Sequence, residues 1–125
     1  MLSFLPPLLR ALIASTALVC NTLFWCSLLF LFAILRLLLP FQAARGVLDP
    51  ALNWIANRWV TCNSWWMALT QPTVWDVQGL EQFSYRGWYM VNCNHQSWVD
   101  IFVLQRVFNG RIPLLKFFLK QQLIW

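Results

Sequence analysis

The chain has 125 residues and a formal net charge of +5. Hydrophobic residues make up 60% of the chain, whereas soluble domains contain about 45–50%. Charged residues make up only 10%, whereas soluble domains contain about 25%. A globule of this size could not bury so much apolar surface, so the composition excludes an ordinary soluble domain and indicates that a membrane covers part of the chain. The basic residues are scattered singly, which argues against nucleic-acid binding and favours membrane lipids or phosphate-bearing substrates as partners.

Residues 11–35 carry no charged side chain and are bracketed by Arg10 and Arg36. As a helix with a rise of about 1.5 Å per residue, this run is about 38 Å long, enough to cross a hydrocarbon core of about 30 Å with some tilt. A re-entrant or shallow hairpin fits the same pattern. We therefore predict that residues 1–40 form a membrane-spanning or re-entrant segment, and the run itself does not decide between the two.

The charges on the two sides of this segment are unequal. Arg10 is the only basic residue before it, and eight Lys and Arg residues follow it. The positive-inside tendency therefore predicts that the C-terminal side faces the cytoplasm. The chain has one histidine and four cysteines without a Cys-x-x-Cys pair, so we expect reduced, buried cysteines and no metal site.

A second apolar pattern lies in residues 41–72. Asp49 and Pro50 are typical of an N-cap and a first helical position, so we predict that a helix begins there. The apolar residues recur at spacings of three and four: Leu52, Ile55, Trp59, Cys62, Trp66 and Leu69. More polar residues fall largely off this stripe: Asn53, Asn57, Arg58, Thr61 and Ser64. We predict that residues 41–72 form an amphipathic interfacial helix region. Packing of the stripe on the protein's own core fits equally well, because periodicity does not separate the two.

The rest of the chain, residues 73–125, alternates between strand-like and helix-like patterns. The patterns predict a strand at residues 73–79 and, after a polar loop, a second strand at residues 88–93. They then predict a helix at residues 97–108 and the start of a third strand at residues 111–115. Asn109 and Gly110 supply the C-terminal stop of the helix. This alternation predicts the α/β class, with the first part of an incomplete α/β layer following the membrane segment.

The only histidine, His95, lies between the second predicted strand and the predicted helix, and Asp100 follows five residues later. Asp100 could accept a hydrogen bond from one ring nitrogen of His95 and fix its tautomer, while the other nitrogen takes a proton from a substrate hydroxyl. The hydroxyl would then attack a thioester carbonyl. The pair therefore predicts a general base and its orienting partner.

A structural role accounts for the same residues. Ser97 and Asp100 have the Ser-x-x-Asp spacing of a variant capping box. On this alternative, capping the helix is the whole role of Asp100. With one histidine in the chain, an aspartate five residues later arises by chance about 6% of the time. The spacing alone leaves both roles open.

The longer sequence context around His95 favours catalysis. Residues 91–101, 112–113 and 116–125 resemble the glycerolipid acyltransferase family of 1-acylglycerol-3-phosphate acyltransferases, and most closely its bacterial inner-membrane YihG-like subgroup. The resemblance covers about residues 74–125. It rests on the Asn-His-x-x-x-x-Asp block and on the Phe-Leu-Lys-Gln-Gln-Leu string, and the N-terminal membrane segment fits the usual layout of the family.

The resemblance implies transfer of a fatty acyl group from acyl-CoA or acyl-carrier protein to the free hydroxyl of a lysophospholipid, in phospholipid biosynthesis or remodelling. By position, His95 would be the general base and Asp100 its partner. Asn94 would support the loop, and Lys116 and Lys120 would lie near anionic groups of the substrates, unless they are only solvated or interfacial cations. No dissociable cofactor is implied, because the chain has no Gly-rich phosphate loop or dinucleotide fingerprint.

The sequence departs from the family in one large respect. The later block of the Glu-Gly-(Thr/Ser)-Arg type, which contacts the acceptor's phosphate, is absent, and the acyl-chain tunnel would be incomplete. We therefore expect an N-terminal fragment with little or no activity alone. Two alternatives remain, a non-catalytic membrane anchor or interaction module with a vestigial motif, and a small bitopic membrane protein unrelated to acyl transfer.

Overall fold

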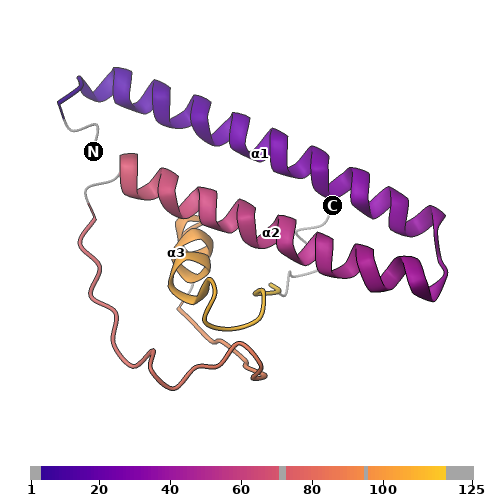
Figure 1. Cartoon of the computed structure of the whole chain (residues 1–125). Helices are drawn as coiled ribbons and strands as arrows, with labels where there is room; N and C mark the ends of the chain where they lie inside the picture. The colour runs from indigo at the N-terminus through magenta and orange to yellow at the C-terminus, as the bar shows by residue number, and fades with distance from the viewer. Residues whose placement is uncertain (1–3, 71–72, 95, 118–125) are drawn as a thin grey trace.

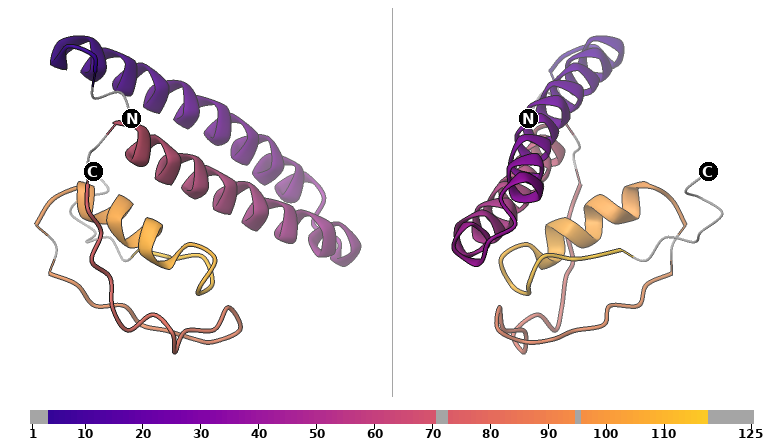
Figure 2. Two further views of the ribbon diagram at one scale, coloured as in Figure 1. Left: turned by 60° about the vertical axis from the view of Figure 1, so that its left-hand side comes forward. Right: turned by 90° about the vertical axis from the view of Figure 1, so that its right-hand side faces the viewer.

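The computed structural model of the chain describes residues 4–70, 73–94 and 96–117 (Figure 1). Within these ranges there are three α-helices and no β-strand. The first two helices form a long antiparallel hairpin, and the third lies against the second (Figures 1 and 2). The predicted α/β class is therefore wrong for the described part of the chain, which is all-helical.

The first helix, α1, spans Pro7–Leu38 and extends beyond the predicted run of residues 11–35 at both ends. Pro7 occupies the first helical position, where its fixed φ suits the helix and its missing N–H leaves no bond unmade. No side chain of α1 is buried, and α1 is the one helix among the described residues that is long and apolar enough to cross a membrane. Its length and composition are consistent with membrane association.

The second helix, α2, spans Gln42–Thr70, so the predicted start at Asp49 is wrong and Pro50 lies inside the helix. The side chain of Asp49 does not cap α2. Its carboxylate instead accepts hydrogen bonds from the guanidinium of Arg36 on α1, across the turn that joins the two helices. Asp49, whose local sequence is typical of a helix start, therefore forms an ion pair with a residue of the preceding helix.

The Arg36–Asp49 pair makes the stability of the hairpin depend on pH. The hydrogen bond from Arg36 lowers the pKa of Asp49 below its ordinary value of 3.8. Because the pKa is lower in the folded than in the unfolded chain, the pair stabilises the hairpin above about pH 4, and this contribution is lost as pH falls through the lowered pKa. Both side chains are 43% exposed, so solvent screens the pair and the effect is small.

We expect the wild type to have a higher melting temperature than Asp49→Asn at neutral pH, and the two values to converge in acid. A difference that persists at low pH would contradict this account.

Two polar contacts join the hairpin along its length. The side-chain amide of Asn21 donates to Oδ1 of Asn63 at 2.8 Å, and the indole N–H of Trp66 donates to the carbonyl of Ala14 at 2.7 Å. Polar bonds of this kind fix the register of two helices, because a slip would leave their groups unpaired in apolar surroundings. The buried side chains of α2 are Ile55, Val60, Asn63, Met67 and Thr70.

This buried set shows which face of α2 meets the rest of the chain. The helix contacts α1 and α3 through it. The buried face is shifted from the predicted stripe, because Asn63 and Thr70 are buried whereas Leu69 is 55% exposed. Asn63 lies in the interface because its hydrogen-bond partner comes from α1, which periodicity within α2 could not indicate.

Replacing Asn63 with leucine is expected to lower the free energy of unfolding by about 1 kcal/mol, because the amide of Asn21 then faces an apolar group. The double replacement Asn21→Leu/Asn63→Leu should recover most of the loss, since both polar groups are removed together. Unfolding of the detergent-solubilised chain, followed by circular dichroism, measures both values. Additive losses in the double variant would show that the two amides do not stabilise each other.

The third helix, α3, spans Val99–Phe108 and agrees with the prediction for residues 97–108 within two residues. It ends as predicted, with Gly110 at a φ of 74°, a conformation that glycine adopts without strain. Arg106 of α3 donates from its guanidinium to the carbonyl of Ser64 at 2.5 Å. This bond ties α3 to the C-terminal half of α2 (Figure 2).

The three predicted strands are not formed. Residues 73–79 and 88–93 are extended but unpaired, and residues 111–115 begin as a turn that continues the end of α3. The alternating patterns predict side chains that pack on one face, yet Val74 is 95% and Trp88 is 98% exposed. A strand needs a partner for its backbone hydrogen bonds, and none of the described segments provides one.

Candidate functional site

The segment before α3 is organised by the carboxylate of Asp100. Its Oδ2 atom accepts hydrogen bonds from the backbone N–H of Gln96 at 2.6 Å and of Ser97 at 2.8 Å. The hydroxyl of Ser97 in turn accepts from the backbone N–H of Val99 at 3.2 Å. Asp100 is in the first turn of α3, where a negative charge also interacts favourably with the helix dipole. The result is a turn whose two backbone amides are bound to one carboxylate.

This geometry contains the contacts that the capping alternative predicts. The Ser-x-x-Asp spacing brings Ser97 and Asp100 together, with Oγ and Oδ1 3.5 Å apart. The details differ from a standard capping box, because the N-cap residue is Trp98 and its side chain makes no cap hydrogen bond. Asp100 therefore has a structural role in holding residues 96 and 97, whatever else it contacts.

The proposed general base lies outside the described residues. His95 is not described, so its distance to Asp100 is not part of the structure. The residues on both sides are described, and Asn94 and Gln96 are both exposed. Because Gln96 N–H is bound to the Asp100 carboxylate, position 95 directly precedes in the sequence a backbone amide that this carboxylate holds.

Asn94 and Lys116, the other predicted site residues that the structure describes, lie on opposite sides of α3 in the sequence. Lys116 is exposed in the segment after α3, and Lys120 lies outside the described residues. Cys93, expected to be a buried core residue, is instead exposed and has a free thiol. Among the described residues, no cluster of three or more His, Cys, Asp and Glu side chains could hold a metal ion.

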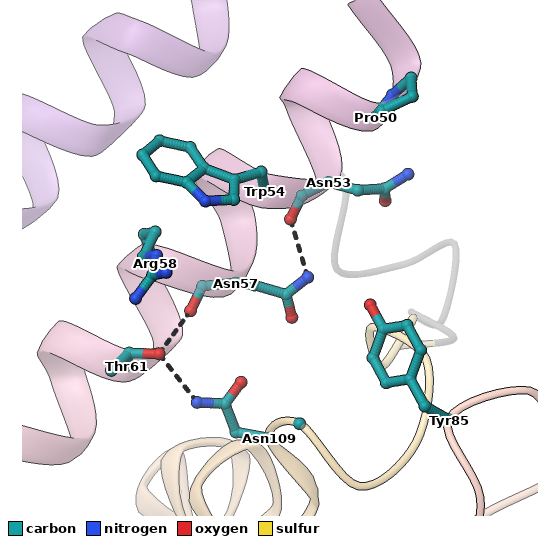
Figure 3. Close-up of a pocket in the computed structure, with 9 residues that line it drawn as sticks. Pro50, Asn53, Trp54, Asn57, Arg58, Thr61, Tyr85 and Asn109 are labelled. Carbon is teal, nitrogen blue, oxygen red and sulfur yellow. Dashed lines mark hydrogen bonds between the residues drawn. The ribbon is translucent and has the colours of Figure 1, made fainter.

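Sequence reasoning missed a pocket of about 430 Å³ between α2, the loop around Tyr85 and the C-terminal end of α3 (Figure 3). Its polar lining comes chiefly from Asn53, Asn57 and Thr61, which lie one helical turn apart on α2, and from Asn109. These α2 residues belong to the polar set that falls off the apolar stripe. Their spacing signals a common polar face, but Tyr85 and Asn109 are brought to it only by the tertiary fold.

Comparison with known proteins gives no further assignment, because no protein-family model, no curated protein and no solved structure matches the chain.

Proposed function

We propose that the chain carries the catalytic histidine and aspartate of a membrane-bound glycerolipid acyltransferase. The observation that supports this best is the Asp100 carboxylate, which lies in the first turn of α3 and binds the backbone immediately after position 95. A carboxylate at this place suits an orienting group for a preceding histidine, because it binds the backbone amide that directly follows position 95 in the sequence. The sequence resemblance supplies the reaction class.

In this proposal His95 takes the proton from the free hydroxyl of a lysophospholipid such as 1-acylglycerol-3-phosphate. The hydroxyl oxygen attacks the thioester carbonyl of acyl-CoA or acyl-carrier protein, and the new C–O bond forms as the C–S bond breaks. The departing thiolate receives the proton from His95, so the histidine is regenerated. Asp100 orients the imidazole, Asn94 supports the loop, and Lys116 and Lys120 contact anionic groups of the substrates.

We further propose that α1 attaches the protein to the bacterial inner membrane with the segment after α2 on the cytoplasmic side. Asn63 bonds to Asn21, and Trp54 stacks edge-on with Trp25 at 6.4 Å between ring centroids, so the middle of α2 lies beside the middle of α1. Arg58 is therefore level with the centre of α1. If the whole hairpin crossed the bilayer, the charged side chain of Arg58 would lie in the middle of the hydrocarbon core. Burying the charge there would cost about 2.5–3.5 kcal/mol or more. The hairpin lying along the interface, with the apolar face of α1 in lipid, avoids that cost.

A non-catalytic membrane anchor or interaction module is the second candidate. The hydrogen bonds from Gln96 and Ser97 to Asp100 favour it, because they give the carboxylate a capping role that needs no catalysis. On this alternative the motif around His95 is vestigial, and the helical hairpin itself is the functional part of the chain.

Acyl transfer to a panel of lysophospholipids, including lysophosphatidic acid, separates the two candidates. The assay uses membranes that carry the chain together with whatever sequence naturally follows Trp125, and His95→Ala is the matched control. Transfer that collapses in the control supports the acyltransferase and identifies the acceptor class. Equal transfer in both proteins, or none with any acceptor, favours the non-catalytic module.

A further inference from the structure

The pocket on the polar face of α2 has its amide groups held in fixed orientations. The Nδ2 atoms of Asn53, Asn57 and Asn109 donate to the carbonyl of Asp49 at 3.1 Å, the carbonyl of Asn53 at 2.9 Å and the hydroxyl of Thr61 at 3.0 Å. The Thr61 hydroxyl gives its own proton to the carbonyl of Asn57 at 2.9 Å, so it can only accept from Asn109. Each amide nitrogen is therefore used within the protein, as Figure 3 shows for Asn57 and Asn109.

The consequence is a set of amide oxygens available to a ligand. The Oδ1 atoms of Asn53, Asn57 and Asn109 accept no hydrogen bond from any described residue. The hydroxyl of Tyr85 lies across the pocket from them (Figure 3). Amide oxygens placed in this way suit a ligand with several hydroxyl groups, because each hydroxyl can donate to an amide oxygen and can accept from the second N–H of an amide.

The charge of the pocket comes from Arg58. Its guanidinium lies over the ring of Trp54, with its central carbon 5.4 Å from the ring centroid. This cation–π contact positions the guanidinium beside the pocket, and a guanidinium can make two parallel hydrogen bonds to an anion such as phosphate. Among the nine described residues that line the pocket there is no Asp or Glu to compete for it.

The position of Trp54 connects the pocket to the apolar surface of the hairpin. Trp54 is 55% exposed and contacts Trp25 of α1, next to the exposed ring of Phe24. A ligand whose polar group fills the pocket can therefore lay an apolar chain along α1 without leaving the protein surface. Tryptophan and arginine at such a boundary match the headgroup level of a bilayer.

We infer that this pocket binds the phosphorylated polyol headgroup of an anionic membrane lipid, with Arg58 on the phosphate and the three asparagine amide oxygens on the hydroxyls. The inference goes beyond the proposed function, because Asp100, the predicted orienting residue, does not line the pocket. Such a lipid would hold α2 at the membrane surface and is distinct from the acyl acceptor.

The test titrates the detergent-solubilised chain with four short-chain or soluble probes: phosphatidylglycerol, phosphatidylethanol, phosphatidylcholine and free glycerol phosphate. The first two have the same charge, but only phosphatidylglycerol has headgroup hydroxyls. Calorimetry measures the affinities, and circular dichroism confirms that each variant is folded. Arg58→Gln removes the phosphate contact, and Arg45→Gln is the matched control, because it removes an exposed charge from the same helix outside the pocket.

We expect phosphatidylglycerol to bind most tightly of the four, with affinity reduced about tenfold or more in Arg58→Gln and less than about threefold in Arg45→Gln. Asn57→Leu and Tyr85→Phe should each reduce the preference for phosphatidylglycerol over phosphatidylethanol. Equal losses in the two arginine variants, or no preference between these two lipids in the wild type, would overturn the inference. Glycerol phosphate that binds as tightly as the lipid would overturn the assignment to a membrane lipid.

Discussion

Replacing Asp100 with asparagine is expected to lower kcat/KM for acyl transfer by about 10³–10⁴-fold, in the chain with its natural continuation. The asparagine side chain keeps one oxygen that can accept a hydrogen bond from Gln96 or Ser97, so the turn before α3 should persist. It cannot stabilise an imidazolium, however, and it can hold the histidine in the wrong tautomer. The measurement is steady-state transfer with the acceptor that the panel identifies.

The matched control for this prediction is Ser97→Ala. It removes the hydroxyl that accepts from Val99 N–H but leaves the carboxylate in place, so it should cost about 0.5–1.5 kcal/mol of stability and change activity little. A catalytic role for Asp100 predicts a large activity loss only in Asp100→Asn. If both variants lose stability while Asp100→Asn keeps full activity, Asp100 is a cap and not an orienting group.

Replacing Ile55 with alanine is expected to have the largest effect on stability, a loss of about 2–5 kcal/mol in the free energy of unfolding. Ile55 is only 2% exposed, and it lies two helical turns before Asn63, on the face of α2 that contacts α1. Truncation there removes packed methyl groups and leaves a cavity that two long helices cannot easily close.

Chemical or thermal unfolding in detergent, monitored by circular dichroism, gives this value. Leu69→Ala on the same helix is the control, because Leu69 is 55% exposed and its truncation should cost less than about 0.5 kcal/mol. Similar losses at both positions would mean that detergent, rather than α1, covers the face that contains Ile55.

The elements that the sequence predicts correctly are those whose signals are local. The uncharged run of residues 11–35 lies within α1, and the pattern of residues 97–108 with its glycine stop corresponds to α3. The predicted start of α2 failed because Asp49 pairs with a residue of the preceding helix. The strand predictions failed because alternation describes side chains only, whereas a sheet also needs backbone partners from elsewhere in the chain.

In the candidate site, too, the contact with a local sequence signal could be predicted and the one that depends on the tertiary fold could not. The contact between Ser97 and Asp100 follows from a spacing of three residues, and it is present. The pocket could not be predicted, because Asn57 and Tyr85 become neighbours only when the segment after α2 folds back on it. For Trp59, whose buried indole N–H has no partner among the described residues, we have no physical account.

The bond between Asn21 and Asn63 joins residues that are separated by 42 positions in the chain. During synthesis Asn21 leaves the ribosome first, and its amide has no protein partner until residue 63 has followed. An isolated α1 would therefore enter lipid with an unpaired polar group, whereas the assembled hairpin would not. Membrane association of α1 should thus be more complete when translation has passed α2, so that the two helices reach the interface as one hairpin.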